Sequence, residues 1–584
     1  MFDVDTPRET ATVIPDLLPA QVLQVRGPED VGLPHWNYLA EHESAAISVT
    51  KPQLAGLLVL LVLAVLTFFI DPLLIGASAI AGAMALYVIS MMYKTATTAR
   101  GANGLTVVSD KEARSISDAA LPVVTILLPA FKEYRTVLQH LTEALDRMEY
   151  PKDRLDIKFL IEECDELTLR YLYSLQLPRY YEIVVTSKFG PQTKPKACNI
   201  GLARAVGEIT VIYDVEDDPD PLQLRKVVFA FRDLNSRLTS PKGKVAAIQC
   251  MLQYRNAYEP AEPFFWRRPR NAASNRPAGY GEWAIGIRDQ IWERVNPLVK
   301  LMDIEYLSYF RQIIGGLATA RHPVVPLGGT SNFFLTDELR RLGAWDAFNV
   351  TEDQELGIRY ACHGYRVVAL DSVTLEKAED SWANWFKQRR RWEKGKFQTY
   401  AVKMRHPITV ARQLGPRGFL QFQLVIGLPL LLLLLNPVFW SLSILYGLSM
   451  PGVFSLLVPD WHLPLLGSLE DVLEPLRYVV NDTIYRMYRQ PALYMGNLCM
   501  WLGNALFLLY MVVAAIRHGK PGTSMWTLFM PFYWFALSWV TLRAFVEFFV
   551  DPHSWSKSEH KPQGDDLIHL ISPETPAQQM QSLG

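Results

Sequence analysis

Carboxylate side chains gather directly after two apolar, β-branched runs of the chain. They are Glu162, Glu163 and Asp165 after the first run, and Asp214, Glu216, Asp217 and Asp218 after the second. In a parallel sheet both clusters would lie at the carboxyl edge, where ligands bind. We expect adjacent strand ends, whose clusters would repel each other unless a cation lay between them. Hard oxygen ligands suit Mg²⁺ or Mn²⁺ with substrate phosphates. For either cluster alone, a solvated loop is the alternative.

Two lysines open the helix expected just before the second cluster. Lys194 and Lys196 belong to the sequence Lys-Pro-Lys-Ala-Cys-Asn, where their positive charge opposes the helix dipole. An anionic ligand would remove this conflict, because a helix N-terminus and a lysine together bind phosphate. A solvated helix start without a ligand is the alternative.

Three further motifs follow along the chain. They are Gly329-Thr330-Ser331, the acidic triplet Thr351-Glu352-Asp353, and a basic and aromatic run that contains Gln388, Arg391 and Trp392. The last run precedes an apolar segment, so it suits an anchor at a membrane interface. Its Gln-x-x-Arg-Trp pattern downstream of an acidic triplet favours a functional role.

Short apolar runs alternate with amphipathic helical patterns around these motifs. Strands are expected at 123–130, 157–161, 182–186 and 209–213, and helices at 136–148, 167–175 and 197–206. Such alternation predicts a parallel sheet covered on both faces. The sheet would place the acidic clusters at its ligand-binding edge.

The overall composition is an average of two different parts. The chain has 584 residues, a net charge of −1, 50% hydrophobic and 20% charged residues, and five scattered cysteines. Balanced charge argues against nucleic-acid binding, and the cysteine spacing argues against a disulfide scaffold or structural zinc. Apolar runs flank a domain of soluble composition at about 101–416. These runs predict about six transmembrane helices, at 54–70, 73–93, 419–435, 438–457, 493–516 and 523–545.

Basic residues next to these runs predict the orientation in the membrane. Lys94 and Arg100 follow the second run, and Arg405, Arg412 and Arg417 precede the third, which places the domain in the cytoplasm.

The last spans leave a conflict with this rule. With six simple spans, Arg517, His518 and Lys520 would lie outside, unless one late segment is re-entrant or interfacial. The amphipathic stretch 459–490 is expected at the interface, and Arg543 is expected near a helix end with its charge snorkelling to water.

The motifs in this order resemble glycosyltransferase family 2, and within it the membrane-embedded processive branch of bacterial cellulose synthases and related β-glucan synthases. The resemblance covers about residues 50–560 and includes Tyr-Asp-x-Glu-Asp-x-Pro-Asp-Pro at 213–221. It implies an α/β domain of the Rossmann-like GT-A fold inserted between the helices of an all-α membrane domain. The implied units are a cytoplasmic segment at 1–50, a transmembrane hairpin at 51–94, the GT-A domain at 101–416, transmembrane and interfacial helices at 417–550, and a cytoplasmic tail at 551–584.

The resemblance also implies a role for each motif. Asp214 and Glu216 would hold Mg²⁺ or Mn²⁺ on the donor diphosphate, with Asp217 as the alternative second ligand. Glu163 or Asp165 would lie near the uridine, and Lys196 near the diphosphate. Asp353 of the triplet that contains Glu352 would be the general base. The acceptor would bind near Gly329, Thr330, Ser331, Gln388, Arg391 and Trp392.

The implied function is an inverting, processive transferase in the bacterial inner membrane. It would polymerise a β-linked exopolysaccharide, most simply a β-glucan, from a UDP-sugar such as UDP-glucose, and export it through its own channel. The growing polysaccharide, the lipid bilayer and accessory export or periplasmic proteins would be its partners, and nucleic acid would not. The segment at 555–560 resembles the Trp-x-Lys-Thr-x-His box of this family.

Two other functions are compatible with parts of this pattern. A non-processive transferase that adds one sugar to a lipid carrier would share the fold and the metal motif, but typically lacks Gln-x-x-Arg-Trp. A transporter with a regulatory soluble insert should show prominent charges inside its spans. Arg543 is nearly alone there.

Overall fold

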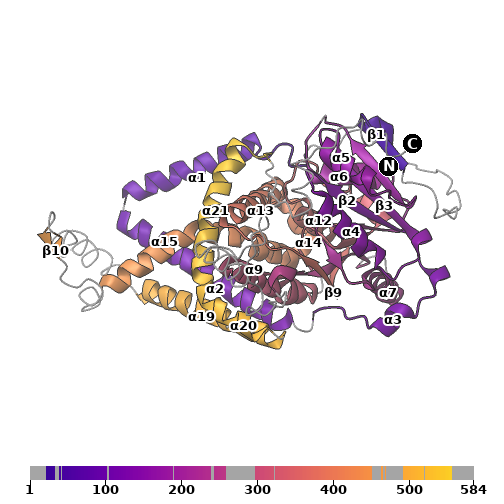
Figure 1. Cartoon of the computed structure of the whole chain (residues 1–584). Coiled ribbons are helices and arrows are strands. Elements are labelled where there is room, and N and C mark those ends of the chain that lie inside the picture. Colours follow the sequence, from indigo (N-terminus) through magenta and orange to yellow (C-terminus); the bar gives the residue numbers. More distant parts are fainter. Residues whose placement is uncertain are drawn as a thin grey trace.

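Among the described residues, a nine-stranded mixed sheet lies toward one end of the computed structural model, and the apolar helices α1, α15 and α19 lie toward the other (Figure 1). Its strand order is β1-β4-β3-β2-β5-β8-β7-β9-β6. The structure describes residues 21–32, 38–40, 42–70, 72–101, 104–188, 190–238, 243–257, 296–320, 323–449, 462–463, 467–468, 491–518 and 520–554. Most of the expected interfacial stretch at 459–490 and the box at 555–560 therefore lie outside the described residues.

The strands and helices expected in the first half of the domain are confirmed. The strands are β2 (Val124–Ala130), β3 (Leu155–Glu162), β4 (Tyr181–Thr186) and β5 (Ile209–Ile212). The helices are α4 (Arg135–Asp146), α5 (Glu166–Ser174) and α6 (Lys194–Ala203). The four strands pair in parallel and are almost entirely buried, which explains why they are continuous apolar runs.

Two expectations about the sheet are wrong. The acidic clusters do not lie at adjacent strand ends, because β2 separates β3 from β5 in the doubly wound order. The sheet is also not wholly parallel, since β8 (Asn332–Leu335) runs antiparallel to β5. The loop before β8 has already returned to the carboxyl edge of β5, where the Ser331 backbone N–H donates to the Ile212 carbonyl over 2.9 Å. The strand that leaves this loop, β8, must therefore run antiparallel to β5.

Two further long strands complete the half of the sheet beyond β8. They are β7 (Val245–Tyr254) and β9 (Arg366–Glu376), which pair in parallel, and the short β6 (Asp218–Pro219) closes this edge. Helix α12 (Glu352–Cys362) leads into β9, and α13 (Trp382–Lys403) follows it. Because β7 and β9 therefore run in the same direction as β5, the carboxyl ends of β9 and β5 lie at the same edge of the sheet.

The N-terminal segment, to which the sequence assigns no function, belongs to this fold. Strand β1 (Gln21–Val25) adds an edge strand parallel to β4. Farther along, the Ser44 hydroxyl and the Ala45 backbone N–H donate to the buried carboxylate of Asp346, over 2.7 and 2.6 Å. Arg405 donates to the carbonyls of His42 and Ser44. The segment therefore supports the loop that precedes the Thr351-Glu352-Asp353 triplet.

Apolar helices lie before and after the sheet domain in the sequence. They are α1 (Lys51–Ile70), α2 (Pro72–Gly101), α14 (Pro407–Phe422), α15 (Leu428–Ser449), α19 (Pro491–Arg517) and α21 (Met530–Val550). Among the described residues, four helical stretches are long and apolar enough to cross a bilayer, at 78–101, 407–444, 494–517 and 522–550. The apolar helix at 51–67 is shorter.

The expected break at Asn436-Pro437 is absent from the described helix α15. The helix continues through Pro437 to Ser449, so the two runs predicted there as separate spans are one helix. The Asn436 amide donates to the Ser538 hydroxyl of α21 over 2.9 Å. Asn436 therefore joins two helices rather than ending one.

Small residues allow α2 and α19 to pack closely side by side. A side chain at Gly496 would lie 2.6 Å from the Met84 sulfur, and Gly503 packs on Met91 in the same way. The Tyr87 hydroxyl donates to Asn504 over 2.7 Å. Close backbone approach and a buried polar pair are typical of helices that associate within a bilayer.

We expect Asp346→Ala to lower the melting temperature of the detergent-solubilised protein by several degrees. The substitution removes the acceptor of the Ser44, Ala45 and Phe348 hydrogen bonds, and each such bond contributes about 1 kcal/mol. Scanning fluorimetry measures the effect, with Glu166→Ala at an exposed position as the control. An unchanged melting temperature would show that the N-terminal segment does not depend on this carboxylate.

Candidate functional site

The residues predicted to do chemistry converge at the carboxyl edge of β5. Asp214 follows this strand, and the Lys194 ammonium at the start of α6 lies 2.5 Å from its carboxylate. The same ammonium donates to the Gly329 carbonyl over 2.7 Å. A methyl group on Gly329 would lie 3.5 Å from the Asp353 carboxylate at the start of α12. One lysine and one glycine thus stand between the candidate metal ligand and the candidate base.

Asp217 supports the turn that carries Asp214. Its carboxylate accepts the Asp214 backbone N–H over 2.8 Å and also the Thr330 hydroxyl. Thr330 in turn accepts the Asp214 N–H over 3.2 Å. Burial and the neighbouring Asp214 carboxylate raise the pKa of Asp217 to about 8. Asp217 therefore stabilises the turn through one carboxylate oxygen, while its other oxygen is buried without a hydrogen-bond partner in the described structure.

Ser331 occupies the tightest point of the neighbouring loop. Its φ of 55° lies in the left-handed region, which L-residues adopt rarely. Its hydroxyl donates to the Thr374 hydroxyl of β9 over 2.7 Å. The loop 328–331 is thereby fixed between β5 and β9.

Glu376, which sequence reasoning missed, adds a carboxylate to this edge from the end of β9. Burial, followed by the charges of Asp217 and Glu216, raises its pKa far above the ordinary value. Burial and the neighbouring acids raise the pKa of Glu216 as well. Glu376 ends a strand just as Asp214 follows one. A sequence pattern that predicted β9 would therefore have indicated Glu376 as a candidate site residue.

The carboxylates at this edge fit a divalent cation. Within the described part of the chain, no three His, Cys, Asp or Glu side chains form a ready metal cage. However, one oxygen each of Asp217 and Glu376 is buried without a hydrogen-bond partner in the described structure. Mg²⁺ and Mn²⁺ sites often use only one or two carboxylates, with substrate phosphates completing the shell. Asp214, Glu216 and Glu376 could hold such an ion.

The acidic triplet opens α12 beside this edge. Burial raises the pKa of Asp353 to about 6, although the Gln354 backbone N–H and Lys194 oppose the shift. Burial and the neighbouring Asp353 raise the pKa of Glu352 to about 7. A carboxylate with a pKa near neutrality is suited to general-base work. The geometry thus keeps Asp353 as the candidate base.

Lys194 and Arg391 supply the positive charge that faces these acids. Burial opposes the charge of Lys194, but Asp214 and Glu352 more than offset it and raise its pKa. Burial lowers the pKa of Arg391, which Glu352, Asp214 and Asp353 partly counteract. The sequence analysis names Lys194 at this helix start but assigns the diphosphate to Lys196, whereas the structure places Lys194 against Asp214.

The predicted donor-side residues are more dispersed. Lys196 is wholly buried, with its ammonium against Glu162 over 3.1 Å and the Ser187 carbonyl over 2.8 Å. Asp165 caps α5 by accepting the Thr168 N–H, and it also accepts the Lys132 N–H. Glu163 is exposed. The structure thus gives Lys196 and Asp165 internal partners, while their contact with a donor stays a prediction.

Trp392 stands on a buried polar cluster that joins the sheet domain to α21. The Arg389 guanidinium lies 4.3 Å from the Trp392 ring centre and pairs with Glu305 over 2.6 Å. The Tyr533 hydroxyl of α21 donates to Glu305 over 2.7 Å. One side-chain oxygen of Gln388 is buried without a hydrogen-bond partner in the described structure. The Gln-x-x-Arg-Trp helix is therefore fixed from both sides.

Residues 122–395 match the family model described as glycosyltransferase like family 2. The sheet domain is thus similar to glycosyltransferase family 2 domains. Among curated proteins, it is similar to the probable glycosyltransferase YdaM of Bacillus subtilis, with 22% identity over 278 residues. These residues are 47% of this chain and 55% of that protein. These matches support the resemblance to glycosyltransferase family 2, while the processive branch stays a prediction.

Other similar proteins carry different functions in their names. The β-monoglucosyldiacylglycerol synthase of Synechocystis is 24% identical over 278 residues, 47% of this chain and 48% of that protein. The chain spans about half the length of the curated relatives it matches. Among solved structures, mannosyltransferase PcManGT from Pyrobaculum calidifontis, with GDP-Man and Mn²⁺, has a TM-score of 0.38 and 18% identity. That match covers 76% of this chain and 98% of the other.

We expect Glu376→Gln to weaken Mn²⁺ binding about tenfold, because a carboxylate beside a metal site typically contributes that much. Loss of the free Mn²⁺ signal in electron paramagnetic resonance measures binding by the full-length protein with UDP present. Glu166→Gln, which changes an exposed glutamate, is the matched control. Equal affinity in both variants would exclude Glu376 from the cation site.

Proposed function

We propose that this protein is a membrane-bound, inverting glycosyltransferase that elongates a β-linked polysaccharide from a UDP-sugar. The observation that carries the proposal is the grouping of Asp214, Lys194 and Asp353 around the Gly329 loop. At this edge, Asp353 would act as a base beside Lys194, which would face the donor diphosphate. A family 2 domain between apolar helices supports the same conclusion.

Asp353 would remove the proton from the attacking hydroxyl of the acceptor. Its raised pKa, about 6, leaves it ionised at neutral pH and still basic enough to accept a proton. Attack by that hydroxyl on the anomeric carbon expels the nucleoside diphosphate in one displacement. A single displacement inverts the anomeric carbon, so an α-linked donor gives a β-linked product.

Lys194 and Arg391 would stabilise the negative charge of the departing diphosphate. Lys194 is held by the Asp214 carboxylate, and the charges of Glu352, Asp214 and Asp353 act on Arg391, so both cations would need little rearrangement during the reaction. A divalent cation at Asp214, Glu216 and Glu376 would supply further charge on the phosphate oxygens. The site is thus organised around the leaving group.

Trp392 would present a flat apolar face to the terminal sugar of the acceptor. Arg389 fixes its ring from one side, and Tyr306 lies nearly parallel at a ring-centre distance of 6.4 Å. Because α13 also packs on α21, the acceptor site adjoins the apolar helices. We infer that the growing glucan passes from here into the membrane domain, from the cytoplasm through the bacterial inner membrane.

A second candidate function is transfer of one sugar to a lipid. The similarity to a β-monoglucosyldiacylglycerol synthase favours this alternative. Both functions use the same donor edge and the same base, and they differ only in the acceptor.

Asp353→Asn should lower sugar transfer at least about a hundredfold, because general-base catalysis commonly contributes that factor. The assay incubates the full-length protein in lipid nanodiscs with radiolabelled UDP-glucose and Mn²⁺, and measures both insoluble polymer and chloroform-soluble product. Asp153→Asn, at an exposed aspartate, is the control.

The product distinguishes the two functions. A β-glucanase-sensitive polymer supports elongation, whereas a chloroform-soluble monoglycoside establishes the second candidate. Substantial transfer by Asp353→Asn would show that another group is the base.

A further inference from the structure

Helix α21 has the composition of a transmembrane span, but both of its ends contact the sheet domain. Near its start, the Tyr533 hydroxyl donates to Glu305 over 2.7 Å. Near its end, Glu547 pairs with Arg390 over 3.0 Å. Just beyond the helix, the Lys394 ammonium donates to the Ser554 carbonyl over 2.7 Å. A span leaving the domain would carry one end about 30 Å away.

Ring contacts between the two ends show that α21 runs along α13. Trp385 packs on Tyr533 with ring centres 5.0 Å apart, and Phe397 packs on Phe545 at 5.2 Å. The contacts progress in the same direction on both helices. In Figure 1, α21 lies next to α13, with α1 and α15 on the side away from the sheet domain. Helix α21 therefore borders the domain over its whole length.

The face of α21 that points away from α13 is apolar and exposed. Its residues recur at helical spacing and are Phe532, Phe535, Trp539, Leu542, Val546 and Phe549, each 42% exposed or more. The opposite face, which includes Tyr533, Val540 and Ala544, is buried against the rest of the protein. An exposed apolar stripe of this size would be in contact with lipid, and the contacts of both helix ends with the sheet domain place that lipid at the membrane surface.

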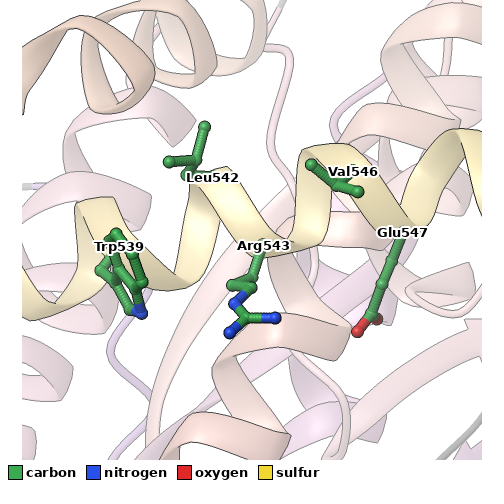
Figure 2. A pocket seen from close by; sticks show the side chains of 5 residues that line it. All are labelled: Trp539, Leu542, Arg543, Val546 and Glu547. Atoms are coloured by element: carbon green, nitrogen blue, oxygen red, sulfur yellow. The ribbon is translucent and has the colours of Figure 1, made fainter.

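A cavity with one arginine and one glutamate in its lining lies on this exposed face. The cavity has a volume of about 280 Å³ and is lined by Trp539, Leu542, Arg543, Val546 and Glu547. Figure 2 shows that Trp539, Arg543 and Glu547 project from one side of α21 in a row. Contrary to expectation, Arg543 lies well inside the helix rather than near its end.

The charges around this cavity favour an anion. Arg390 at 3.0 Å and Lys394 at 3.9 Å compensate Glu547. In the described part of the chain, Arg543 forms no ion pair, and its guanidinium carbon lies 6.0 Å from the Trp539 ring centre. Arginine binds phosphate through paired hydrogen bonds, and tryptophan is enriched at the level of lipid head groups.

We propose that α21 lies in the plane of the membrane surface and that Arg543 binds the phosphate of an anionic phospholipid there. This placement makes the bilayer itself the partner of the apolar stripe. Because α15 replaces two of the predicted spans, α19 returns to the side of the sheet domain, where the Lys520 ammonium lies 3.3 Å from Asp303. The basic residues at 517–520 then obey the positive-inside rule, and α21 in the membrane surface keeps Ser554 on the same side.

Spin labels at Phe532→Cys and Val546→Cys test the placement of the helix. The two sites face the same way and lie 14 residues apart, which is about 21 Å along a helix. The full-length protein carries Cys164→Ser and Cys499→Ser and is placed in nanodiscs of phosphatidylcholine and phosphatidylglycerol. Oxygen and nickel-chelate accessibility then give each label's depth. Equal shallow depths support the proposal, whereas depths about 20 Å apart overturn it.

Lipid retention tests the phosphate site separately. Native mass spectrometry compares phosphatidylglycerol bound to wild type, Arg543→Gln, Arg543→Lys and the exposed control Arg170→Gln, with phosphatidylcholine as competitor. We expect about tenfold less bound phosphatidylglycerol for Arg543→Gln, partial retention for Arg543→Lys and no change for the control. Unchanged retention by Arg543→Gln would overturn the site, and the depth measurement needs no change at Arg543.

Discussion

The structure depends on burying several carboxylates at one edge of a sheet with few cations to balance them. Lys194 is central, because it touches Asp214 and the Gly329 loop and acts on Glu352 and Asp353 through space. Without a ligand, the acids raise one another's pKa values. A bound cation would relieve this repulsion, and a diphosphate would bind to that cation. The unfavourable burial of these carboxylates therefore lies where the reaction needs charged ligands.

The same edge is continuous with the apolar helices through α13. Arg389, Glu305 and Tyr533 form a buried polar network between the Trp392 platform and α21. Breaking such a network leaves an uncompensated buried charge, which is strongly destabilising. The sheet domain and α21 therefore hold one fixed relation, and a polymer made at Trp392 would meet the membrane helices at a defined place.

Strand ends carried most of the information that the sequence offered about the site. Asp214 could be predicted because buried parallel strands are continuous apolar runs and their ends bind ligands. The acidic triplet could be predicted only from its order relative to the other motifs. Glu376 and β1 could not, since one follows an unpredicted strand and the other is a short edge strand with little apolar pattern. The sequence also could not predict that α21 runs along the sheet domain. Hydropathy depends on composition alone and carries no information on the contacts of Tyr533 and Glu547.

The pH dependence of Lys194→Met tests the electrostatic account most directly. Asp353 must be ionised to act as base, so wild-type transfer should fall as the pH drops through about 6 to 7, the pKa values of Asp353 and Glu352. Removing the positive charge of Lys194 raises both pKa values. At saturating donor and Mn²⁺, the fall in transfer on the acidic side of the pH profile should then occur about one pH unit higher in Lys194→Met than in wild type. An acidic limb that stays in place or moves to lower pH would contradict the account.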